Sequence, residues 1–104
     1  MANLVIVYWR DIPAQVIAER GRGRKKVGVK VELNDRFAKA IDSAAMNKGI
    51  TGTDEYLSLW RRAVPLECGD DLAAEAEKMV NVLDEDYTKD RLLGLIKNGG
   101  LEVI

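Results

Sequence analysis

The segment from Val27 to Ala63 constrains the fold of this chain more than any other. Its first residues alternate between apolar and polar side chains, and this two-residue period is typical of a strand with one buried face. The apolar members of the alternation are Val27, Val29, Val31 and Leu33. A helix, a turn and a second helix are predicted to follow, so the segment forms a strand–helix–turn–helix unit.

The first predicted helix begins after Asn34, a good N-cap residue, and ends at Gly49, a residue type common just after a helix. Its inner stripe has helical spacing and consists of Phe37, Ile41, Ala44 and Ala45. A second helix is predicted after Thr51 or Thr53 and is stopped by Pro65. The residues predicted to line its inner face are Tyr56, Leu57, Trp60 and Ala63.

Two further strands are predicted before this unit. The apolar run from Leu4 to Trp9 is typical of a strand buried on both faces. Pro13 is expected to break this strand in a turn, and residues 14–20 form the next one. The simplest arrangement is a three-stranded antiparallel meander, which needs a helical layer over one face to be stable.

The C-terminal part is predicted to be helical. Asp70 is expected to cap a third helix, and a break is placed at Asp84-Glu85-Asp86 before a short fourth helix that ends at Asn98-Gly99-Gly100. The fold class is therefore α+β: a small three-stranded antiparallel sheet covered by three to four helices. Residues 1–104 are expected to be a single domain, with an α+β core at 4–64 and a helical extension at 65–104.

Composition removes several classes of chemistry. The chain has no histidine and one cysteine, which excludes a Cys/His zinc site, a disulfide within the chain and the catalytic arrangements that use histidine as a base. We expect a protein that is not an enzyme and has no cofactor or metal; the alternative is an enzyme that uses carboxylates, lysine, tyrosine or Cys68. The N-terminus has no signal-peptide pattern and no apolar run is long enough to cross a membrane, so the expected location is cytoplasmic.

Charge is unevenly distributed along the chain. Residues 1–48 contain ten Lys/Arg and five Asp/Glu, whereas residues 63–104 contain four and ten. The strongest basic run is the predicted hairpin tip, with Arg20, Arg22, Arg24, Lys25 and Lys26. These side chains could bind an anion or an acidic protein partner, or they could simply solvate a loop and protect a sheet edge.

Trp9, Arg10 and Asp11 form a second candidate contact site. Tryptophan and arginine are common among the residues that dominate protein interfaces. The alternative is a structural corner in which Arg10 and Asp11 pair with each other.

Two other features have a structural and a functional interpretation. Cys68 precedes a predicted helix, whose N-terminus could activate a thiolate, but Asp70 and Asp71 oppose this and a structural cysteine is the alternative. The acidic run at 84–86, with Asp90, could bind Ca²⁺ or Mg²⁺, but it lacks the spacing of a calcium loop and fits a solvated helix break.

The unit at residues 27–63 resembles the ribbon-helix-helix repressors. In that class a strand pairs with its copy from a second subunit, and the paired ribbon enters the major groove of DNA. The matching positions here are Lys26, Gly28 and Lys30. The resemblance implies a dimeric DNA-binding regulator, so nucleic acid and a homodimer are retained as alternatives.

A wider resemblance covers roughly residues 4–64. The sequences Tyr8-Trp9-Arg10-Asp11-Ile12-Pro13-Ala14-Gln15-Val16, Arg36-Phe37, Ala40-Ile41-Asp42, Ala44-Ala45-Met46 and Trp60-Arg61-Arg62 are similar to a small bacterial family called virulence factor. The resemblance implies no particular chemistry, and it carries over no catalytic residues to this sequence. The missing catalytic inventory and the basic hairpin predict a cytosolic protein-interaction or accessory protein. The resemblance adds, as an alternative, an accessory role in folate or corrinoid one-carbon metabolism.

Overall fold

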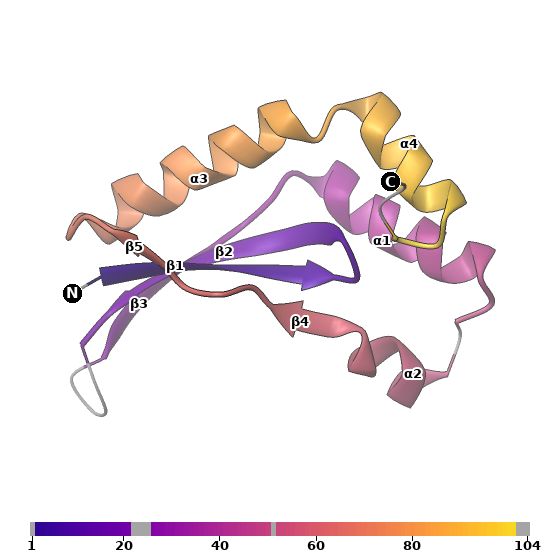
Figure 1. Cartoon of the computed structure of the whole chain (residues 1–104), viewed down its shortest axis with the longest axis horizontal. Helices are drawn as coiled ribbons and strands as arrows, with labels where there is room; N and C mark the ends of the chain where they lie inside the picture. The colour runs from indigo at the N-terminus through magenta and orange to yellow at the C-terminus, as the bar shows by residue number, and fades with distance from the viewer. Residues whose placement is uncertain (1, 22–25, 51, 102–104) are drawn as a thin grey trace.

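The structure is a computed structural model that describes residues 2–21, 26–50 and 52–101. Within these residues an antiparallel sheet of five strands is combined with four helices, which confirms the predicted α+β class (Figure 1). In chain order the elements are β1 (Ala2–Trp9), β2 (Ile12–Arg20), β3 (Val27–Glu32), α1 (Asp35–Asn47), α2 (Thr53–Ser58), β4 (Trp60–Arg62), β5 (Leu66–Cys68), α3 (Leu72–Asp86) and α4 (Lys89–Lys97).

The three predicted strands form an antiparallel meander in which β2 lies between β1 and β3. β1 pairs with β2 from Ala2 opposite Arg20 to Trp9 opposite Ile12. The sheet has five strands rather than the predicted three because β4 and β5 both pair with the other edge of β1. β1 is therefore a central strand, which explains its nearly continuous apolar sequence.

The two additional strands come from residues predicted to be helix and connector. α2 ends at Ser58, and Trp60–Arg62 pairs with Val7–Trp9 as β4. β5 pairs with Ala2–Leu4. The helical prediction for residues 59–63 is wrong because the open edge of β1 offers hydrogen bonds to this backbone, and that pairing outweighs the helical spacing of its apolar residues.

The turn between β1 and β2 is shorter than predicted. Only Arg10 and Asp11 separate the strands, and Pro13 lies inside β2 instead of breaking it. Proline is accepted there because the register shifts between Val7 and Tyr8, and a bulge near the start of a strand does not require every amide to donate. Arg10 has a φ of 53°, the left-handed conformation that a two-residue hairpin loop favours.

α1 begins and ends where its sequence predicted. The Asn34 side chain accepts a hydrogen bond from the Arg36 amide at 3.1 Å, and Gly49 takes a φ of 66° after the helix. The buried stripe is Phe37, Ala40, Ile41, Ala44 and Ala45.

α3 packs over β2 and β3, and α4 packs beside α1 (Figure 1). The predicted break between the two C-terminal helices exists, but it lies at Tyr87 and Thr88 because α3 continues through residues 84–86. The reason is Arg36 of α1, whose guanidinium pairs with the Asp84 carboxylate at 3.0 Å and donates to the carbonyls of Asp84 and Tyr87 at 2.6 and 3.1 Å. This cation caps the C-terminal end of α3 and offsets the acidic run.

The ends of the two C-terminal helices agree closely with the sequence. The N-cap of α3 is Asp71 rather than the predicted Asp70. α4 is capped by Thr88 and is followed by Gly99 and Gly100 with φ of 67° and 94°. Of the described residues, no helix combines the length and apolar character needed to cross a membrane.

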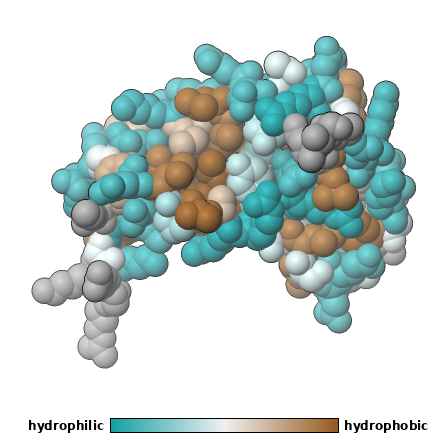
Figure 2. Space-filling model, viewed as in Figure 1, coloured by the Kyte–Doolittle hydropathy of each residue, from teal (hydrophilic) through white to brown (hydrophobic). Residues whose placement is uncertain are grey.

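The core lies between the sheet and the helices, with Trp9, Phe37 and Ile12 as its largest fully buried side chains. On the face seen in Figure 2, apolar surface gathers beside α3 and is bordered by polar residues. Val64 and Leu66, in and next to the segment that joins β4 to β5, are 81% and 48% exposed. The core lies inside the molecule, whereas these two apolar side chains near β4 reach solvent.

Candidate functional site

The corner predicted at Trp9, Arg10 and Asp11 is tied to the rest of the molecule. Trp9 is completely buried, and its indole nitrogen donates to the Tyr56 carbonyl at 3.1 Å. Arg10 donates to the Gly99 carbonyl at 3.1 Å. Trp9 therefore supports this corner from the core rather than from its surface.

The alternative interpretation of this corner pairs Asp11 with Arg10, but in the structure Asp11 has a different partner. Its carboxylate pairs with the Arg61 guanidinium at 3.2 Å, and Arg61 also donates through Nε to the Arg10 carbonyl at 2.8 Å. The hairpin loop between β1 and β2 is thus held by an arginine of β4, although its sequence pattern predicts a helix at this residue.

The basic loop is described only at its two ends. Arg20 donates to the Asp70 carbonyl at 3.3 Å, and Lys26 pairs with Glu19 at 3.2 Å. Arg22, Arg24 and Lys25 lie outside the described residues. Arg20 and Lys26 remain exposed despite these contacts, so both residues lie at the surface.

The positions predicted to read DNA lie at and beside β3. Lys26, Gly28 and Lys30 are all exposed. β3 pairs with β2 on one side and is the end strand of the sheet among the described elements. The edge that would pair with a second copy is therefore open in the described structure, and DNA binding through that pairing stays a prediction.

Cys68 is half-buried in β5. Burial, followed by the nearby carboxylates of Glu75 and Asp70, raises the pKa of the Cys68 thiol. Each of these effects disfavours the thiolate, so the local environment opposes nucleophilic chemistry at this residue.

The acidic run at the end of α3 is paired with arginines. Asp84 pairs with Arg36, and Asp86 pairs with Arg91 at 3.3 Å. In the part of the chain that the structure describes, no group of three carboxylate or thiol residues is arranged to hold a metal ion.

A hollow of about 310 Å³ lies between the β1–β2 corner, β4 and the junction of α3 with α4. We call it the arginine–tyrosine hollow, and its lining residues are Tyr8, Asp11, Arg61, Ala63, Tyr87 and Arg91. The Arg61 guanidinium carbon lies 4.5 Å from the centre of the Tyr8 ring. The corresponding distance from Arg91 to the Tyr87 ring is 4.0 Å. Both guanidinium groups are therefore held by a tyrosine ring and a carboxylate.

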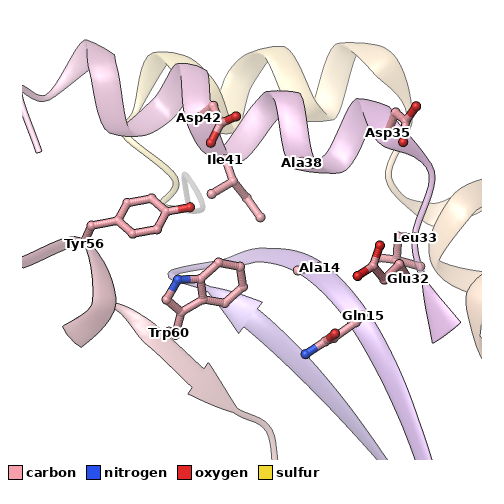
Figure 3. A pocket seen from close by; sticks show the side chains of 10 residues that line it. All are labelled: Ala14, Gln15, Glu32, Leu33, Asp35, Ala38, Ile41, Asp42, Tyr56 and Trp60. Atoms are coloured by element: carbon pink, nitrogen blue, oxygen red, sulfur yellow. The ribbon is translucent and has the colours of Figure 1, made fainter. Parts of the chain in front are cut away.

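A second cavity, of about 270 Å³, lies between α1, α2, β4 and the adjoining ends of β2 and β3 (Figure 3). We call it the acidic–aromatic pocket. Its polar and aromatic residues are Gln15, Glu32, Asp35, Asp42, Tyr56 and Trp60, and its apolar residues are Ala14, Leu33, Ala38 and Ile41. Figure 3 shows the Tyr56 hydroxyl, the Trp60 ring and the Glu32 carboxylate directed toward the same space.

The aromatic wall of this pocket is connected to the core. The rings of Tyr56 and Trp60 are 6.1 Å apart in an edge-to-face arrangement, and Tyr56 lies 5.7 Å from the ring of Trp9. Burial, followed by the negative charge of Asp42, raises the pKa of the Tyr56 hydroxyl above its usual value. The hydroxyl therefore stays protonated and can donate a hydrogen bond into the pocket.

Strand β4 separates the two cavities. Successive residues of a strand point to opposite faces, and Trp60 lines the acidic–aromatic pocket while Arg61 lines the arginine–tyrosine hollow. Neither cavity is predicted from the sequence, because the helical spacing places both residues in one helix. The tripeptide Trp60-Arg61-Arg62 is too short for a two-residue period to be recognised.

A comparison with models of protein families identifies the virulence factor family, whose model matches residues 7–96. The match extends beyond the resemblance at residues 4–64 and includes α3 and α4. No curated protein and no solved structure is significantly similar to the chain.

Proposed function

The chain belongs to the virulence factor family, and we propose that it is a non-enzymatic interaction protein that binds a protein partner through the arginine–tyrosine hollow. The observation that carries this proposal is the pair of guanidinium groups that are stacked on tyrosine rings around one cavity. Arginine and tyrosine are two of the three residue types that most often dominate the binding energy of protein interfaces.

Preorganisation supports this assignment. Arg61 is fixed by Tyr8, by Asp11 and by the Arg10 carbonyl, although its side chain is 49% exposed. An arginine that is already ordered loses less conformational entropy when a partner binds. The hollow thus offers a rigid surface at a position that solvent reaches.

The composition of the surroundings indicates the chemistry of the partner. The two arginines of the lining are each paired with a carboxylate, Asp11 or Asp86, but a guanidinium group carries five N–H donors, so a carboxylate on the partner can still bind to it. Val64, which follows Ala63 of the lining, is 81% exposed and gives an apolar contact beside the charged one. We expect a partner segment that combines an acidic residue with an apolar one.

The basic loop is a second proposed contact. Arg20 and Lys26 are exposed at its described ends, and their charge favours an acidic partner surface. A contact there would add steering, which increases the association rate and weakens as salt is added.

Site-specific photo-crosslinking tests the first contact. A photoreactive amino acid replaces Ala63 in the hollow, and a control protein carries it at Ala73, an exposed residue of α3 outside the hollow. We expect a discrete adduct with one protein from cell extract at physiological salt only from position 63. The Arg61→Ala change should reduce its yield, whereas Arg62→Ala should not, because Arg62 is exposed and does not line the hollow.

The proposal fails if position 63 gives no discrete adduct, or if position 73 captures the same protein equally well. It also fails if Arg61→Ala and Arg62→Ala reduce the yield to the same extent, since a general effect of positive charge would then explain the capture.

A further inference from the structure

We propose that the acidic–aromatic pocket is a binding site for an organic cation, either an alkylammonium or a guanidinium group. The site lies on the other side of β4 from the arginine–tyrosine hollow and does not depend on the function proposed for that hollow. Three independent properties of the pocket lead to this ligand: its charge, its aromatic wall and its size.

The described residues that line the pocket give it a negative charge. Its lining contains the carboxylates of Glu32, Asp35 and Asp42 and no lysine or arginine. Among the described residues, the ion pairs seen in the structure involve carboxylates other than these three. A cation in this pocket would therefore meet negative charge that no cation of the described chain already neutralises.

The aromatic wall adds a preference for an organic cation. Tyr56 and Trp60 are both half-buried, so part of each ring remains accessible. Cations are attracted to the faces of tryptophan and tyrosine rings, and the attraction is strongest for tryptophan. The contact of Tyr56 with the buried Trp9 fixes this wall from the core, so the rings need little reorganisation when a ligand arrives.

The arrangement of the carboxylates and the size of the pocket favour an organic cation over a bare metal ion. The described carboxylates do not converge into a group that could coordinate a metal. The volume of about 270 Å³ lies just below the roughly 300–1,000 Å³ of pockets that bury drug-sized ligands. Ala14, Ala38 and Ile41 give the pocket an apolar part, which suits the hydrocarbon chain attached to an ammonium or guanidinium group.

Nuclear magnetic resonance titration tests the site with simple probes. Methylguanidinium is added to the whole chain, and N-methylurea serves as the uncharged probe of the same shape. We expect methylguanidinium to produce a saturable shift of the Trp60 indole signal, with a smaller shift at the buried Trp9. N-methylurea should produce no saturable shift at either residue.

A pair of variants identifies the groups responsible. The double change Glu32→Gln and Asp42→Asn should weaken methylguanidinium binding roughly tenfold, because each exposed charge pair contributes up to about fivefold. The matched control is Glu67→Gln, an exposed carboxylate of β5 outside the pocket, which should change binding by less than about twofold.

The proposal is overturned if methylguanidinium produces no saturable shift of the Trp60 indole, or if N-methylurea produces the same shift. Equal weakening by the double change and by Glu67→Gln would also overturn it. A capped peptide with one arginine distinguishes the sources of the cation. If the peptide binds more tightly than methylguanidinium, the ligand of the site is a side chain of a protein. If the peptide binds equally well or more weakly, the ligand is a small molecule.

Discussion

Trp60 and Arg61 are neighbours in the chain, yet they face two cavities of opposite character. Trp60 faces a pocket lined by three carboxylates and two aromatic rings, whereas Arg61 faces a hollow lined by two arginines and two tyrosines. Both cavities use aromatic rings to hold or attract a cation. In the hollow the cation belongs to the protein, and in the pocket the cation would come from a ligand.

The difference shows how a three-residue strand can place two sites back to back. β4 pairs with the end of β1, so Trp60 lies opposite Trp9 and Arg61 lies opposite Tyr8. The alternation of side chains along a strand then sends consecutive residues to different faces. If these residues had continued α2 as a helix, consecutive side chains would follow the helical period and would not point to opposite faces.

The largest expected effect concerns Trp9, the buried residue that supports the aromatic wall of the acidic–aromatic pocket. Trp9→Ala should reduce the free energy of unfolding by about 3–5 kcal/mol, because Trp9 is completely buried and its removal leaves a cavity. Trp60→Ala should cost only about 1–2 kcal/mol, since Trp60 is half-buried. Urea denaturation of both variants measures this difference, and equal losses would contradict the different placement of the two rings.

The next effect concerns the glycine that lies on the Trp9 ring. Gly100 has a φ of 94°, and a Cβ atom there would approach Trp9 Cζ3 to 2.7 Å. Gly100→Ala should therefore cost about 2–4 kcal/mol in the free energy of unfolding. Gly94→Ala is the matched control, because no described atom beyond its neighbours and the backbone of its own helix lies within 4 Å of the added Cβ, and α4 should gain up to about 1 kcal/mol. A loss at Gly94 that equals the loss at Gly100 would be inconsistent with this packing.

A smaller effect separates two adjacent arginines of β4. Arg61→Ala should reduce the free energy of unfolding by about 0.5–1.5 kcal/mol, because it removes an exposed ion pair with Asp11 and a contact with the Tyr8 ring. Arg62→Ala should change it by less than about 0.5 kcal/mol, as is usual for exposed residues without such contacts. Thermal denaturation at low and high salt compares the two variants. A larger loss of stability for Arg62→Ala would contradict the placement of Arg61, and not Arg62, against Asp11 and Tyr8.

The smallest effect is a pH dependence in the acidic–aromatic pocket. Folding raises the pKa of Tyr56, so its contribution to stability is complete below the usual tyrosine pKa of about 10 and is lost as the pH rises through the folded value. Asp42→Asn should lower the pKa of Tyr56 toward the usual value, although burial still raises it. Absorbance titration at alkaline pH, with Tyr56→Phe to assign the transition, checks this. An unchanged pKa in Asp42→Asn would show that the carboxylate does not act on this hydroxyl.

Much of the scaffold could be predicted from the sequence, because its signals are local. Asn34 and Gly49 mark the ends of α1, and the alternation from Val27 identifies β3. The α+β class follows from these elements. The number of strands could not be predicted, because β4 and β5 have three residues each and exist only where β1 offers them an open edge.

The two cavities could be predicted only in part. Asp11 was identified beside the corner, and Arg10 contributes its carbonyl there, but Arg61 and Arg91 come from elements far away in the sequence. The pocket likewise combines residues of six elements and loops, and nothing in the local patterns brings Glu32, Asp42 and Trp60 together. Sites of this kind depend on the pairing of β4, which is a tertiary contact.

The strand pairing of β4 is therefore the claim on which both sites depend, and nuclear Overhauser measurements between backbone protons test it most directly. The structure predicts cross-strand contacts between Trp9 and Trp60 and between Tyr8 and Arg61, which are paired residues of β1 and β4. Helical contacts from Leu57 to Trp60, without those cross-strand contacts, would contradict it.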